Sequence, residues 1–133
     1  MNFLLRHRCQ KRRCRNRKDK HIMSDHKVIG RFYFKKTDSG NLIGEFSNNH
    51  HNLRPSTESA DLLVESQQDG FIGVYHTTWQ EGGIPFIAEL HISAKNENRL
   101  ILSLQWCIRG KSAFEGEAML CDGMLIGNYW YCK

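Results

Sequence analysis

Short apolar runs, separated by turn-forming residues, extend from Lys27 to the end of the chain. Runs of this kind, rich in Val, Ile, Phe and Tyr and bounded by Gly, Asp, Asn and Ser, are typical of β-strands. No stretch keeps apolar residues at helical spacing over three turns. The pattern therefore predicts an all-β domain with eight strands, at residues 27–36, 41–47, 60–66, 70–79, 84–93, 100–108, 113–121 and 124–132.

The connections between these strands are short and polar. Asp122-Gly123, between two apolar runs, is the strongest hairpin signal in the chain. The longest connection, residues 48–59, contains Pro55, which is expected to interrupt regular pairing, and a helical turn is expected only within 56–63. Because short connections cannot cross over a sheet, sequential strands should pair antiparallel as a meander. Eight such strands can close into an up-and-down barrel, which removes the exposed edges of an open meander.

Most of the expected strands have one apolar face. In 84–93 the even-numbered residues are all apolar, whereas the other face carries Glu89, His91 and Ser93. The segments 70–79 and 124–132 differ, because both of their faces are apolar or aromatic. A strand that is buried on both sides needs a second covering layer. We therefore expect a homo-oligomer with these two segments at or near the contact.

Several of these strands contain a glycine two residues before an aromatic residue: Gly30-Arg31-Phe32, Gly44-Glu45-Phe46, Gly73-Val74-Tyr75 and Gly127-Asn128-Tyr129. On a meander over roughly residues 27–132, these units resemble the calycin-type barrels, the group that includes lipocalin-like, fatty-acid-binding and avidin-like proteins. The resemblance implies an eight-stranded barrel with a ligand cavity at one end. It implies no particular ligand, and we expect no cofactor.

Charge divides the chain into two parts. The 133 residues carry a net charge of +5, but residues 1–22 alone contain nine Lys or Arg and one Asp, so the remainder is mildly acidic. Like charges at this density prevent collapse. We expect a disordered basic leader at 1–26 and one β-barrel domain at 27–133. The leader is either an upstream extension before a true start at Met23 or an arm that binds nucleic acid or an anionic surface.

The five cysteines form no dense framework, which favours reduced thiols in a reducing compartment. Phe3-Leu4-Leu5 is too short for the apolar core of a secretory signal. No apolar run approaches the length of a membrane-spanning helix. These observations predict a soluble cytoplasmic protein without a membrane partner.

If the glycine–aromatic face points inward, aromatic rings and a few hydroxyls would line the cavity. Such a surface suits a mostly apolar ligand held by a few polar contacts, or it simply fills the barrel as core. The predicted ligand-binding residues are Phe32, Phe71, Tyr75, Thr77, Trp79, Trp106, Tyr129 and Tyr131.

Other candidate chemistry has weaker support. His76, His91 and the pair Glu115 and Glu117 fall on faces expected to point outward, where such side chains are usually solvated. His50-His51 lacks a third metal ligand, and Cys9 with Cys14 fits no common zinc spacing. We therefore predict no catalytic residue and no metal site.

Three functions follow from this sequence. The first is a noncatalytic barrel that binds a small apolar or aromatic ligand. The alternative is an oligomeric scaffold whose basic arm binds RNA or DNA. A weaker alternative is an enzyme in which an interior tyrosine, such as Tyr75, exchanges protons with a histidine or carboxylate.

Overall fold

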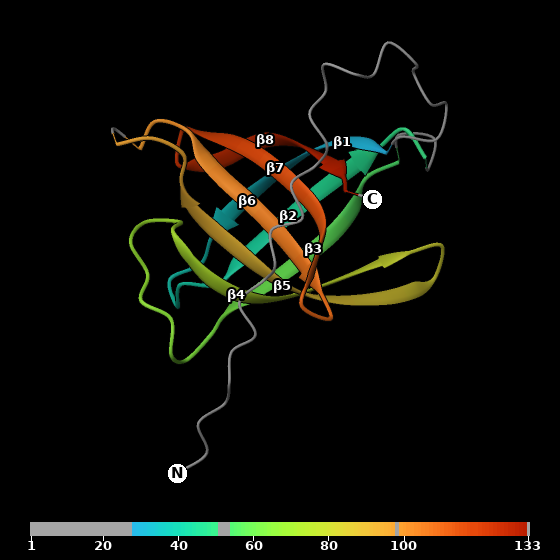
Figure 1. The fold of residues 1–133 in the computed structure, drawn as a ribbon, viewed down its shortest axis with the longest axis horizontal. Helices are drawn as coiled ribbons and strands as arrows, with labels where there is room; N and C mark the ends of the chain where they lie inside the picture. The colour runs from blue at the N-terminus through green and yellow to red at the C-terminus, as the bar shows by residue number, and fades with distance from the viewer. Residues whose placement is uncertain (1–27, 51–53, 98, 133) are drawn as a thin grey trace.

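Eight antiparallel strands close into a barrel in the computed structural model, which describes residues 28–50, 54–97 and 99–132 (Figure 1). Each strand pairs with the next along the chain, and the last pairs with the first. The strands are β1 (Ile29–Lys36), β2 (Leu42–Asn48), β3 (Ser56–Leu62), β4 (Gly73–Glu81), β5 (Ile84–Ala94), β6 (Leu102–Ile108), β7 (Lys111–Cys121) and β8 (Met124–Tyr131). The predicted all-β, up-and-down barrel is confirmed. The predicted leader, residues 1–26, lies outside the described residues.

Two-residue hairpins make several of the connections. Asp122 and Gly123, which join β7 to β8, have φ angles of 53° and 77°. Both central residues also have positive φ in the connection of β6 to β7, Arg109-Gly110, and in that of β4 to β5, Gly82-Gly83. Positive φ at both central residues defines the hairpin turn whose twist matches that of the flanking strands. The hairpin of β4 and β5 extends beyond the body of the barrel (Figure 1).

The third strand differs from its prediction. It begins at Ser56, directly after Pro55, so the last third of the expected connection is strand, and the helical turn expected within 56–63 is wrong. Pairing with β2, from Phe46 opposite Ser56 to Leu42 opposite Ala60, overrides the polar composition of this segment. Pro55 lies just outside the ladder, where its missing N–H group removes no pairing.

The inward faces agree with the alternation in the sequence. Ala88, Leu90 and Ile92 of β5 are buried, as expected, whereas Ile84, expected on the same face, is exposed at the start of the strand. The residues at alternate positions of β4 from Gly73 to Trp79 are buried as well. The outer face of β4 is more exposed to solvent than expected, since His76 and Thr78 are exposed there. On the outer side of β8, Ile126 pairs with Met119 of β7, and both side chains are exposed. The predicted homo-oligomer through 70–79 and 124–132 stays a prediction.

The expectation that the cysteines are reduced thiols is wrong for two of them. Cys107 and Cys132 are buried and disulfide-bonded, whereas Cys121 carries a free, exposed thiol. Disulfides persist mainly in oxidising compartments, so the cytoplasmic location loses the argument from reduced thiols and stays a prediction. Among the described residues there is no helix with the length and apolar character needed to cross a membrane.

Candidate functional site

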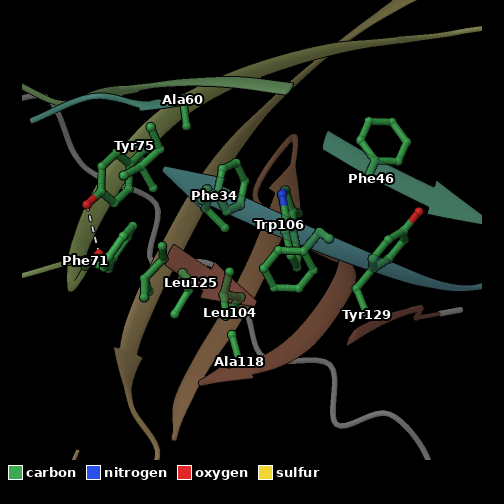
Figure 2. Packing of buried hydrophobic residues seen from close by; sticks show 14 of the residues in the cluster. Phe34, Phe46, Ala60, Phe71, Tyr75, Leu104, Trp106, Ala118, Leu125 and Tyr129 are labelled. Carbon is green, nitrogen blue, oxygen red and sulfur yellow. Dashed lines mark hydrogen bonds between the residues drawn. The ribbon is translucent and has the colours of Figure 1, made fainter. Parts of the chain in front are cut away.

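One end of the barrel interior is sealed around Tyr75, whose side chain is fully buried. Its hydroxyl donates a hydrogen bond to the backbone oxygen of Phe71 at 2.8 Å and accepts one from Nε2 of Gln68 at 3.0 Å. The same Gln68 nitrogen also donates to the backbone oxygen of Gly40 at 2.7 Å, which ties the β1–β2 and β3–β4 connections together. We call this region the sealed end. Figure 2 shows Tyr75 and Phe71 on the opposite side of the core from Phe46 and Tyr129.

The other end contains a recess that is partly open to solvent. We call it the recess. Its cavity volume is about 20 Å³, which is room for about one water molecule, and the whole opening with its solvent measures about 300 Å³. Seven of the eight strands contribute to its lining: Phe32, Phe46, Glu58, Trp79, Glu81, Trp106, Phe114 and Tyr129.

Glu58 is the buried carboxyl of the recess, and only 7% of the residue is exposed. Its Oε2 accepts a hydrogen bond from the Thr77 hydroxyl at 2.6 Å and another from Nε1 of Trp106 at 2.9 Å. Both bonds go to the same oxygen, so they fix the carboxyl while Oε1 receives no hydrogen bond from the described residues. Since Glu58 lines the recess, this second oxygen is available to a guest.

Burial raises the pKa of Glu58 from 4.5 to about 7, and the hydrogen bonds from Thr77 and Trp106 act in the opposite direction. Burial disfavours the charged form of a carboxyl, whereas donors to that form favour it, and burial is the stronger effect here. Near neutral pH the carboxyl therefore exists in both protonation states.

Tyr129 provides the second polar group of the recess. Its hydroxyl accepts a hydrogen bond from Nδ2 of Asn48 at 2.9 Å and keeps its own proton for donation. Burial raises the pKa of Tyr129 to about 12, with Glu81 and Glu58 adding to the rise and the Asn48 bond opposing it. The ring can lie across β1 only because position 30 is glycine: a Cβ there would be 2.3 Å from two ring carbons.

Aromatic rings make most of the wall. The ring of Trp79 stacks on Phe86 with centroids 5.6 Å apart and meets Phe114 edge-on at 6.3 Å. Phe114 in turn meets Tyr129 edge-on at 5.8 Å. Offset and edge-to-face contacts of this kind fix ring positions, so the wall is preformed.

The structure divides the sequence-predicted ligand residues between the two ends. Four of them line the recess: Phe32, Trp79, Trp106 and Tyr129. Thr77 donates a hydrogen bond to the Glu58 carboxyl. Phe71 and Tyr75 belong to the sealed end. Tyr131 is 40% exposed at the rim, with its ring 5.5 Å from that of Phe114.

Sequence reasoning missed Glu58, Glu81 and Asn48 because they lie in segments read as polar turns. For Glu58 a signal was present: it stands two residues before Ala60, so continuing the strand alternation backwards places it on the inner face. The polarity of residues 56–59 and the preceding Pro55 concealed that signal.

The histidines and paired acids considered from the sequence lie elsewhere. Nε2 of His91 is 2.7 Å from Oε1 of Glu89 on the outer face of β5, and His76 is exposed on β4. Glu117 of the acidic pair forms an ion pair with Lys95. Within the described part of the chain no three His, Cys, Asp or Glu side chains gather to hold a metal ion.

Comparisons with known proteins add no family to this picture. No family model, curated protein or solved structure matches the chain. The function must therefore be argued from the site itself.

Proposed function

We propose that this protein is a noncatalytic, calycin-like barrel that binds a small molecule with an apolar or aromatic group. The observation that carries the proposal is the recess: a ring-lined opening at one end of the barrel, with a buried carboxyl whose Oε1 has no hydrogen-bond partner among the described residues. Mostly apolar walls with a few placed polar groups are typical of ligand sites.

The size of the recess limits the ligand. The cavity volume of the recess admits a group about as large as one water molecule, so we expect only a small polar head of the ligand to reach Glu58. The body of the ligand lies in the mouth, against the rings of Trp79 and Phe114. Fatty acids and haem are too large for this cavity volume, and a compact ligand suits the recess better than they do.

The test is a thermal-shift and tryptophan-fluorescence screen with small aromatic alcohols, amines and amides, alongside fatty acids, flavins, haem and biotin. Binding to the native state raises the unfolding midpoint, and Trp79 and Trp106 report occupancy because both line the recess. If no compound shifts the midpoint or the fluorescence, the proposal fails.

A matched pair of variants locates the site. Phe114→Leu removes a ring from the recess, whereas Phe71→Leu makes the same change at the sealed end. We expect the first to weaken binding by about fivefold, since an aromatic contact contributes about 1 kcal/mol beyond its area, and the second to leave affinity unchanged. Equal effects of the two variants would contradict a binding site in the recess.

A second candidate function is proton transfer to or from the bound molecule. It is favoured by the Glu58 pKa of about 7, close to the value that suits a general base at neutral pH. The reaction would appear in D₂O as solvent deuterium entering an acidic C–H position of a bound compound, with loss of exchange in Glu58→Gln. Binding without any exchange favours the noncatalytic function.

The scaffold with a nucleic-acid-binding arm stays a prediction, because residues 1–22 lie outside the described residues. Comparing the full chain with one that begins at Met23 on a heparin column tests it. The prediction requires salt-sensitive retention of the longer form only.

A further inference from the structure

The recess is lined by acidic and aromatic side chains. Its lining contains two carboxyl groups, those of Glu58 and Glu81, and the other lining residues are aromatic. Within the described part of the chain, no Lys, Arg or His lines it. We propose that the recess binds a primary ammonium ion, with the –NH₃⁺ group beside Oε1 of Glu58 and its organic body against the rings at the mouth. This inference rests on the proposed function and names its ligand class.

The geometry of Glu58 favours a cation as guest. A buried carboxylate is stable only when it is paired or well hydrogen-bonded. Its Oε2 has two donors, from Thr77 and Trp106, but Oε1 has none among the described residues. An ammonium group supplies donors and a compensating charge together.

The walls favour the same guest. Cations are attracted to the faces of aromatic rings, most strongly to tryptophan, and more so away from water. Trp79, Trp106, Phe114 and Tyr129 surround the recess with such rings. The cavity volume of about 20 Å³ suits an –NH₃⁺ group, which is close to a water molecule in size, better than the larger trimethylammonium head.

Protonation of Glu58 should compete with the ammonium ion. Because burial raises the pKa of Glu58 to about 7, the carboxyl is largely neutral at pH 6 and largely charged at pH 8. The titratable groups that share the recess are Glu81 at the end of β4 and Tyr129 on β8, and Tyr129 keeps its proton in this range because its pKa is about 12. Cation binding should therefore strengthen as the pH rises from 6 to 8. A neutral guest that accepts a hydrogen bond from the protonated Glu58 carboxyl should instead bind more weakly as the pH rises.

The experiment is calorimetric titration of the full chain with three matched compounds: 2-phenylethylamine, the neutral 2-phenylethanol, and the N,N,N-trimethyl form of the amine. We expect the amine to bind at least about tenfold more tightly than either of the others at pH 8. In Glu58→Gln this preference should disappear. In Glu45→Gln, which removes a carboxyl from the outer face of β2, it should persist.

The outcomes separate this inference from the function beneath it. The ammonium site is supported if the preference for the amine is lost in Glu58→Gln but kept in Glu45→Gln, and if the amine binds more tightly toward pH 8. Equal binding of amine and alcohol overturns the ammonium inference and leaves the binding function standing. So does binding of other compounds in the screen without binding of the amine. If nothing in either set binds, the proposed function fails and the inference with it.

Discussion

The two ends of this barrel use the same strands and the same kind of residue in opposite ways. At the sealed end the Tyr75 hydroxyl is engaged as donor and acceptor, by Phe71 and Gln68. At the recess the Tyr129 hydroxyl accepts one bond, from Asn48, and Glu58 keeps an oxygen without a donor among the described residues. One end completes its polar pairing within the chain, and the other leaves polar groups facing an opening.

This difference suggests separate roles for the two ends, with the sealed end stabilising the fold and the recess suited to binding. Buried polar groups that are fully paired hold a core in one arrangement, whereas an incompletely paired group is retained at an energetic cost. The raised pKa of Glu58 reflects that cost. A carboxyl that only stabilised the fold would be expected to have its charged form favoured by its surroundings.

The largest expected difference between the ends is in the response to ring deletion. Phe34→Ala removes a side chain that is 1% exposed and should lower the free energy of unfolding by about 3–5 kcal/mol. Phe114→Ala removes a partly buried ring beside the recess and should cost about half as much, since water can enter the space. Urea unfolding of both variants measures this difference. Equal losses would show that the recess is packed as tightly as the core around Phe34.

The next largest effect concerns Glu58 and pH. Between about pH 4.5 and 7 the folded protein holds the Glu58 proton and the unfolded chain releases it, so this group's contribution to the free energy of unfolding falls as the pH rises through that window. Glu58→Gln removes the fall. The variant should gain on the wild type with rising pH, by at most about 3 kcal/mol above pH 7. Parallel stability curves for the two proteins between pH 4.5 and 8 would contradict a raised pKa.

The smallest effect compares the two tyrosines. Tyr75→Phe leaves the Phe71 carbonyl without its donor and Gln68 without one acceptor, which should cost about 1–3 kcal/mol. Tyr129→Phe removes one bond, to Asn48, beside an opening where water can replace the hydroxyl, and should cost about 1 kcal/mol or less. Thermal unfolding of the two variants checks this order, and the reverse order would contradict the assignment of the ends.

The barrel could be predicted from the sequence because its signals are local. Asp122-Gly123 adopts the positive φ angles that its composition favours, and Ala88, Leu90 and Ile92 of β5 are buried at alternate positions, as in a half-buried strand. The closure of β8 on β1 followed from the number of strands and the need to avoid open edges.

The candidate site was harder to predict because it depends on pairing between distant segments. Glu58 becomes an interior residue only when β2 and β4 draw a polar segment into the sheet, and its partner Trp106 lies 48 residues away along the chain. Tyr75 and Tyr129 belong to the same glycine–aromatic pattern, so the sequence could not tell the sealed end from the recess. The connection around Gln68 makes that distinction.

The most direct test of the account is a ¹³C NMR titration of the Glu58 side-chain carboxyl, with and without 2-phenylethylamine. We expect a midpoint near pH 7 in the free protein and a midpoint lower by at least about one pH unit with the amine bound, because the ammonium ion favours the charged carboxyl. A midpoint near 4.5 in the free protein, or one that the amine does not move, would contradict the central claim that the Glu58 carboxyl of the recess presents one oxygen to a cationic guest.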